Sequence, residues 1–139
     1  MTEKVRPGRL WVAAIIAAAC ASLVNLLVRF GLVTLFQVND SLFKPLQPIK
    51  VVVLTWVGVF AAAGVLTWIG RRSERPARMF LKVALVALAI SAVPNILILV
   101  FPQFPTTSLT TVSCLYVMHL TGAMVAIPVL LKFGVSRAS

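Results

Sequence analysis

The sequence predicts an all-α integral membrane protein in which four transmembrane helices form one bundle. Hydrophobic residues make up 60% of its 139 residues, charged residues make up 12%, and the mean hydropathy is +1.03. An ordinary soluble domain has about 25% charged residues. A helix needs about 20 apolar residues to cross a bilayer. We therefore expect one domain over residues 1–139, with spans at residues 10–36, 51–70, 79–101 and 109–132.

The first span follows a short polar tail and carries polar residues toward its far end. Asn25 and Arg29 are four residues apart and share a helix face, which Ala14, Ala18 and Ala21 continue. Small residues allow helices to approach closely, and an Asn side chain can hydrogen-bond across them. We therefore expect this face to point into the bundle, although Arg29 has the alternative of extending to the interface.

Turn-forming or charged segments separate the spans. Residues 37–49 hold Asn39-Asp40-Ser41 and two prolines, which favour turns. Residues 71–78, Arg-Arg-Ser-Glu-Arg-Pro-Ala-Arg, have the densest charge in the chain and cannot lie in hydrocarbon. Residues 102–108 form an uncharged turn, and a short tail follows residue 132.

The third span contains Pro94-Asn95. A mid-span proline removes one helical hydrogen bond and usually bends the helix. Ser91 and Asn95 share a face, so we expect the bend to lie beside a polar patch.

The fourth span holds the only histidine of the chain, His119. Tyr116, Gly122, Ala123 and Ala126 lie three, four or seven residues from it and share its face. An ionisable side chain near the middle of a membrane is costly and marks a candidate functional site.

Small residues recur on one face of every span. Because close packing of small residues holds transmembrane helices together, we expect these stripes to face one another in the bundle core. They are Ala14-Ala18-Ala21, Gly58-Ala62, Ala84-Ser91 and Gly122-Ala126.

The distribution of basic residues predicts the orientation. One side of the membrane receives ten of them and the other receives only Lys44 and Lys50. The positive-inside rule places the richer side, with both termini, in the cytoplasm. The ten are Lys4, Arg6, Arg9, Arg71, Arg72, Arg75, Arg78, Lys82, Lys132 and Arg137.

This orientation gathers the polar side chains of the spans in the outer half of the bilayer. His119 falls about 15 Å below the outer boundary, and Asn95 and Asn25 about 20 and 24 Å above the inner one, at 1.5 Å per residue. We expect His119 to lie within hydrogen-bond or one-water reach of a polar group from another span, first of all Asn95 or Asn25. The candidate polar cluster comprises Asn25, Arg29, Thr55, Asn95, Tyr116 and His119.

Three interpretations of this cluster remain open. Its members can hydrogen-bond to one another or to backbone carbonyls, including the one freed by Pro94, and so fix the helix packing. They can line a pocket for a lipid, a quinone or another small amphiphile. His119 can also ligate a haem or chlorophyll type of cofactor, although haem usually has a further axial ligand and the chain has no second histidine.

The sequence lacks the residues that proton-coupled transport, metal binding, nucleotide binding or hydrolysis would need. The acids Glu3, Asp40 and Glu74 all lie outside the spans, so carboxylate-coupled transport is unsupported. The sequence has no metal-ligand spacing and no nucleotide-binding or hydrolase motif. We expect a protein that is not an enzyme and has no metal site. Its basic residues flank spans, which suits anionic lipid headgroups and not nucleic acid.

The chain resembles a family of small four-span bacterial membrane proteins catalogued as a domain of unknown function. The resemblance lies in the four apolar segments, the RRSERPAR turn, and Met118-His119-Leu120 followed by Ala126-Ile127-Pro128. It implies a four-helix bundle in the bacterial inner membrane and no particular activity. We expect a binding or accessory subunit that associates with itself or with a larger membrane complex. A small transporter or channel for an amphiphile, and a cofactor carrier through His119, are the alternatives.

Overall fold

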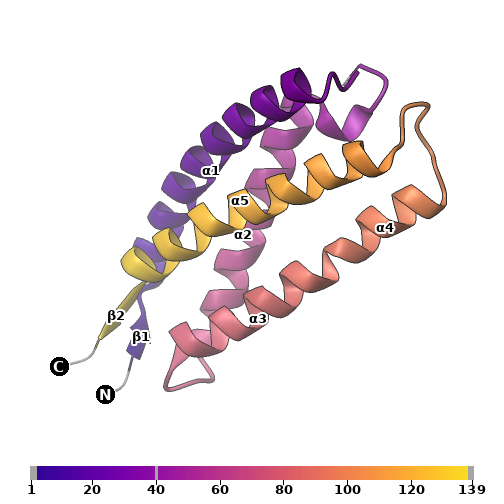
Figure 1. Ribbon diagram of the computed structural model, residues 1–139. Helices are drawn as coiled ribbons and strands as arrows, with labels where there is room; N and C mark the ends of the chain where they lie inside the picture. Colours follow the sequence, from indigo (N-terminus) through magenta and orange to yellow (C-terminus); the bar gives the residue numbers. More distant parts are fainter. Residues whose placement is uncertain (1–2, 40, 138–139) are drawn as a thin grey trace.

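The computed structural model describes residues 3–39 and 41–137, and its elements are mainly helices (Figure 1). Four helical segments are long and apolar enough to cross a membrane, and the third of them consists of α3 and α4 in succession. This agrees with the expected all-α class and number of spans. The helices are α1 (Pro7–Leu35), α2 (Pro48–Gly70), α3 (Pro76–Ile90), α4 (Ala92–Val100) and α5 (Leu109–Gly134), with a 3-10 turn η1 (Lys44–Leu46) before α2.

Local sequence determines where the helices begin. Pro7, Pro48 and Pro76 occupy the first positions of α1, α2 and α3. Proline suits this position because the first turn needs no backbone N–H donor within the helix. Helix α5 begins with a capping box, in which Ser108 and Thr111 bond each other's backbone N–H.

The helices start up to three residues before the apolar runs: at residues 7, 48 and 76, where the spans were expected from 10, 51 and 79. Hydropathy marks the part of a helix that suits hydrocarbon, whereas the helix itself continues into its proline start. At the other end of the chain, α5 continues two residues past the expected residue 132, to Gly134.

The third span is interrupted at Ser91, between α3 and α4. Pro94 lacks the N–H that would bond to the carbonyl of Ile90, so the regular ladder is broken there. The Asn95 side chain donates through Nδ2 to the carbonyl of Ser91 at 3.0 Å, and Ser91 Oγ donates to the carbonyl of Leu88 at 2.6 Å. The bend expected from Pro94 is therefore a local break that polar side chains stabilise.

The two ends of the chain form a structure that we did not expect, since residues 1–9 and the C-terminal end were interpreted as polar tails. Strands β1 (Glu3–Val5) and β2 (Val135–Arg137) pair antiparallel beside each other (Figure 1). The backbone N–H of Glu3 bonds to the carbonyl of Glu74 at 3.1 Å, and Glu3 Oε2 accepts from the N–H of Ala77 at 3.1 Å. Both ends of the described chain and the α2–α3 turn therefore lie at the same end of the bundle, which we call the basic end.

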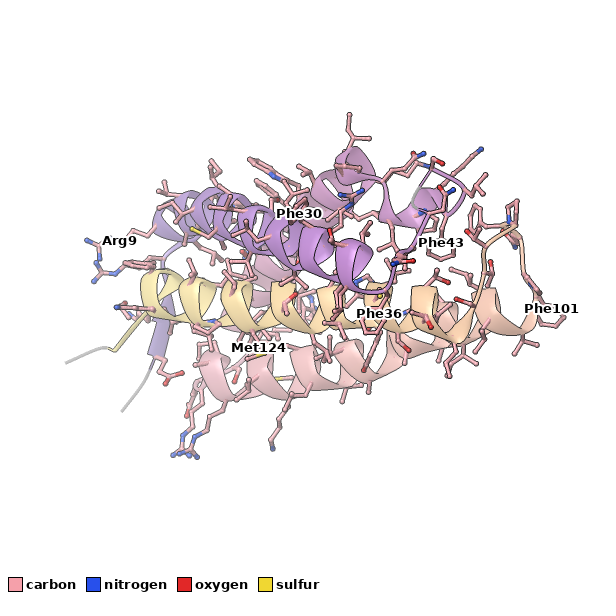
Figure 2. The ribbon with its side chains drawn as sticks, turned by 45° about the horizontal axis from the view of Figure 1, so that its top comes forward. Arg9, Phe30, Phe36, Phe43, Phe101 and Met124 are labelled. Atoms are coloured by element: carbon pink, nitrogen blue, oxygen red, sulfur yellow. The ribbon has the colours of Figure 1, made fainter. Side chains whose placement is uncertain are left out.

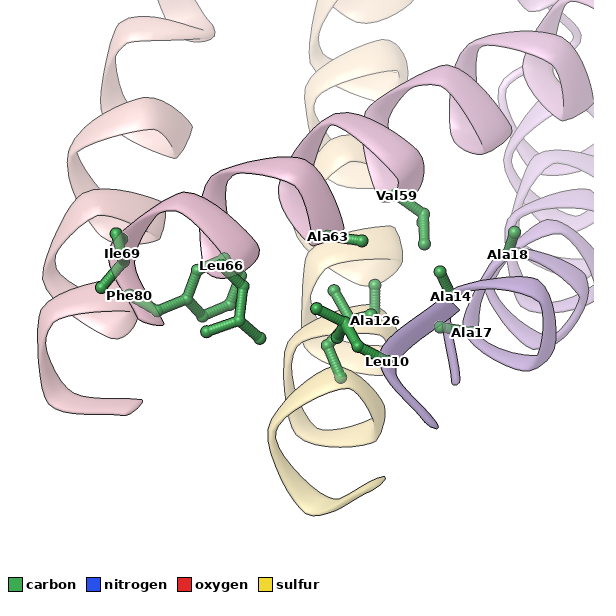
Figure 3. Close-up of a cluster of buried hydrophobic side chains, with 11 residues drawn as sticks. Leu10, Ala14, Ala17, Ala18, Val59, Ala63, Leu66, Ile69, Phe80 and Ala126 are labelled. Atoms are coloured by element: carbon green, nitrogen blue, oxygen red, sulfur yellow. The ribbon is translucent and has the colours of Figure 1, made fainter. Parts of the chain in front are cut away.

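Helix α1 packs against α5 and α2 through an alanine face. Ala14, Ala17 and Ala18 are fully buried against Val59 and Ala63 of α2, as Figure 3 shows. The expected burial of the α1 stripe is confirmed. This first core cluster extends to the basic end through Leu10, Leu66, Ile69, Phe80, Ala126 and Leu130.

A second core cluster lies at the opposite end of the bundle, which we call the far end. Phe43, which precedes the η1 turn, and Leu46, its last residue, are fully buried there against α5. Val51 joins them from the start of α2, and Cys114, Leu115 and Met118 complete the cluster.

Large apolar side chains cover the outside of the bundle. Phe30, Phe36, Phe101 and Met124 are all more than half exposed and project outward (Figure 2). Helix pair α3–α4 is the least covered, since 6% of its most apolar 18-residue stretch is buried, against 39% for α1. A surface of this kind suits hydrocarbon and not water.

Candidate functional site: a cavity between α2, α3 and α5

A cavity of about 410 Å³ lies between α2, α3 and α5, with Asn25 of α1 at its edge. Its volume falls in the range of about 300–1,000 Å³ typical of small-molecule pockets. Aliphatic and small side chains form most of the lining, and the polar lining side chains are Asn25, Thr55, Ser91 and His119. No residue in this lining carries a formal charge when histidine is neutral. The cavity therefore suits a mostly apolar, uncharged guest.

Small residues create this space. Gly58 and Ala62 of α2, Ala84 of α3, and Gly122 and Ala126 of α5 all line the cavity. We expected these stripes to pack directly against one another. Here they line an open volume. Apart from its chain neighbours and the backbone of its own helix, no heavy atom lies within 4 Å of where a Cβ of Gly58 would be.

Asn25 joins three helices at the edge of the cavity. Its Nδ2 donates to Thr55 Oγ1 at 3.1 Å, and its Oδ1 accepts from Thr121 Oγ1 at 2.8 Å. Thr55 Oγ1 donates its own hydrogen to the carbonyl of Val51 on α2. Thr121 Oγ1 also lies 3.1 Å from the carbonyl of Met118 on α5, so these two acceptors share its single hydroxyl hydrogen. We call Asn25, Thr55 and Thr121 the Asn25 network. Asn25 is 5% exposed, so these bonds satisfy an amide that would otherwise be costly to bury.

Other members of the expected polar cluster lie apart from this network. Asn95 is buried, and its amide donates to the carbonyl of Ser91 on its own helix pair. Arg29 donates through Nε to the carbonyl of Leu46, and so ties α1 to the η1 turn. Tyr116 is half-buried on α5 and is not a lining residue of the cavity.

His119 is half-buried and lines the cavity from α5. Within residues 3–39 and 41–137, its imidazole makes no hydrogen bond. Among the described residues, no direct hydrogen bond joins His119 to Asn25 or Asn95, and the two amides bond to other groups. A ring nitrogen of His119 is therefore available to a guest in the cavity. A contact through one water stays a prediction.

Thr121 is the residue of this site that sequence reasoning missed. It lies two residues from His119 and so on a different face of α5, which kept it out of the expected cluster. A signal did exist, because a buried Asn side chain offers both a donor and an acceptor and needs a partner for each.

No metal site is formed by the described residues: no group of three or more His, Cys, Asp or Glu side chains there is placed to hold an ion. Cys114 is buried in α5 and Cys20 is exposed on α1, and both are free thiols. His119 is the only His, Cys, Asp or Glu side chain among the lining residues of the cavity.

The helices and the cavity define a class of small α-helical protein with four membrane-length segments around an apolar pocket. The chain belongs to DUF6069, a family of unknown function, which matches residues 2–135. The expected membership of a domain-of-unknown-function family is thus confirmed. None of the curated proteins and none of the solved structures compared with the chain matches it.

Proposed function

We propose that this protein is a non-catalytic membrane protein that binds an uncharged amphiphile in the cavity between α2, α3 and α5. The observation that carries this proposal is the composition of the cavity wall. An apolar lining without charged groups surrounds His119, whose imidazole has no protein partner among the described residues. A few placed polar groups within an apolar wall are what orient a small-molecule ligand.

The chemistry of the wall narrows the class of ligand. A phosphate or carboxylate headgroup needs a cationic partner when it leaves water, and the lining contains no Lys or Arg. A neutral headgroup needs only a hydrogen-bonding partner, which His119 can supply as donor or acceptor. A quinone, a long-chain alcohol and a diacylglycerol all satisfy these conditions.

The ends of the cavity favour binding over conduction. The core cluster with Phe43 and Leu46 occupies the far end, and the cluster with Leu66 and Phe80 occupies the basic end. A channel would need an aqueous path through both clusters. We therefore propose a binding or accessory subunit, which holds its ligand for itself or for a larger membrane complex.

We place the basic end in the cytoplasm of a bacterial cell, with the protein in the inner membrane. The pairing of β1 with β2 and the contacts of Glu3 bring the chain ends to the α2–α3 turn. Lys4, Arg71 and Arg72 lie on these segments. Clustered basic residues at one membrane boundary support a cytoplasmic location and contact with anionic lipids.

The proposal is tested by purifying the protein in mild detergent and identifying bound lipids by mass spectrometry. Gly58→Leu should fill the cavity and reduce the bound amphiphile several-fold, because open space surrounds this position on the cavity side. Gly64→Leu is the matched control: Gly64 also has open space around it and lies on α2, but it does not line the cavity.

Equal retention by both variants would refute binding in the cavity. An absorption spectrum of the same preparation addresses the alternative of a porphyrin-type cofactor, which the unpaired His119 favours. A visible band that disappears with Gly58→Leu would identify the ligand as such a cofactor and refute the amphiphile.

A further inference from the structure

The exposed part of the cavity wall is confined to two helices. Six lining residues are exposed, and all of them belong to α2 or α3. The eight lining residues of α5 are all buried or half-buried. Helix α5 is therefore the floor of the cavity, and α2 and α3 are its rims. The exposed rim residues are Leu54, Gly58, Ala61 and Val65 on α2, and Val83 and Ala87 on α3.

The rims separate with distance from the α2–α3 turn. The two helices meet beside the chain ends and diverge toward the far end of the bundle (Figure 1). The rim residues are small or aliphatic, and they lie in the middle of segments long enough to span a membrane. The mouth between these rims would therefore face hydrocarbon and not water.

Packed side chains close the cavity toward the far end and toward the basic end of the bundle. At the far end, Leu115 and Met118 belong both to the cavity wall and to the core cluster with Phe43. At the basic end, Phe80 and Leu130 belong both to the wall and to the core cluster with Leu10. The paired chain ends also cover this end, because Val5 lies directly against Gly70.

We propose that the ligand enters sideways, from the hydrocarbon of the bilayer, through the mouth between α2 and α3. This inference rests on the proposed function and specifies the occupant: a long-chain lipid with one compact, uncharged head. The ligand reaches the cavity without crossing water, and a water-soluble compound has no direct route to it.

The length of the floor determines how such a lipid would lie. The lining residues of α5 run from Leu115 to Leu130, which corresponds to about 22 Å at 1.5 Å per residue. His119 is near one end of this floor, and Ala126, Ile127 and Leu130 continue it toward the basic end. The head therefore bonds to His119, about 15 Å from the start of α5, and the chain extends toward the basic end.

The test uses a long-chain alcohol that carries a photoreactive diazirine in its chain. The full-length protein is reconstituted in vesicles of phosphatidylethanolamine and phosphatidylglycerol containing this probe, irradiated, and digested. We expect adducts on the α5 floor at Ala126 and Leu130, because these lining side chains are buried and are therefore shielded from lipid outside the cavity. Adducts at the exposed Phe30 serve as the reference for labelling by bulk lipid.

Substitutions of rim residues test whether the probe reaches the floor through the mouth between α2 and α3. Gly58→Leu and, independently, Ala87→Leu should reduce floor labelling several-fold relative to Phe30, while Gly64→Leu should leave it unchanged. Two variants on different helices guard against a folding defect in one of them. Floor labelling that is absent in the wild type, or equal in all variants, would overturn lateral access.

A second measurement excludes a route from water. Ala123→Cys places a thiol on the floor, in a chain whose Cys20 and Cys114 are replaced by alanine. A charged maleimide should not modify this thiol in intact vesicles, and modification would show an aqueous route and overturn the inference. If the purified protein still retains a neutral amphiphile in that case, binding in the cavity stands and only lateral access fails. If no amphiphile is retained either, both proposals fail.

Discussion

Gly122 of α5 lies directly against the side chain of Asn25 of α1. A Cβ atom at position 122 would be 3.0 Å from Nδ2 of Asn25, which is tighter than nine in ten real Cβ contacts. The same Nδ2 donates to Thr55 on α2. A glycine on one helix thus allows an amide on a second helix to reach a hydroxyl on a third.

We therefore predict that Gly122→Ala destabilises the bundle. The added methyl group must displace the Asn25 amide and lengthen its bonds to Thr55 and Thr121, with a loss of about 1–3 kcal/mol in the free energy of unfolding, as for other overpacked sites. Reversible unfolding in detergent, followed by circular dichroism, measures this loss. Gly58→Ala is the control, because open space surrounds Gly58. Equal effects of the two substitutions would show that Gly122 does not contact Asn25.

The Asn25 network predicts a measurable coupling between helices. Thr121→Val keeps the shape of the side chain and removes its donor to Asn25, and Thr55→Val removes the acceptor in the same way. Each should cost about 0.6–1.7 kcal/mol, the range measured for polar contacts between membrane helices. In a double-mutant cycle with Asn25→Ala, each threonine substitution should cost much less once Asn25 is absent. Full additivity would contradict the network.

The sequence predicted the positions of the helices better than the contacts among their polar side chains. Spans follow from apolar length, and the break near Pro94 follows from a missing N–H, so both are local properties. The pairing of β1 with β2 joins residues that are at least 130 positions apart, and three-residue strands have no sequence pattern of their own. Nothing local indicates such a contact.

The cavity is a second feature that could not be predicted from the sequence. Small residues such as Gly58 and Ala84 permit close packing and permit open space equally well, and the distance between helices decides between the two. Asn95 presents a similar ambiguity, because its amide can reach another helix or the carbonyl four residues earlier in its own. In the structure Asn95 takes the second option and bonds to the carbonyl of Ser91.

The arrangement of the chain ends leads to a prediction about topology. A reporter fused after Ser139 should be read in the cytoplasm, and one inserted near Ser41 should be read outside, in whole-cell assays of reporter activity. The reason is the excess of basic residues at the end of the bundle that holds β1, β2 and the α2–α3 turn. A periplasmic C-terminus would reverse the orientation and place the far end in the cytoplasmic leaflet.

Because the imidazole of His119 has no hydrogen-bond partner among the described residues, a substitution of His119 can test its role in ligand binding separately from a role in stability. His119→Leu removes no hydrogen bond within the described part of the chain. The free energy of unfolding of the ligand-free protein should therefore change by no more than about 0.5 kcal/mol, as at sites without specific interactions. Retention of a neutral amphiphile should fall several-fold, because the head of the ligand loses its only open partner on the floor.

His119→Gln distinguishes the kind of contact that His119 makes with the ligand. An amide supplies both a donor and an acceptor, so this variant should retain much of the bound amphiphile if the contact is a hydrogen bond. If His119 instead ligates a metal in a porphyrin, glutamine should fail as completely as leucine, and the visible absorption band should disappear in both variants. Mass spectrometry of bound lipid and an absorption spectrum of each variant measure these outcomes. A loss of stability in His119→Leu without any change in ligand retention would show that the imidazole has a structural role and does not contact the ligand.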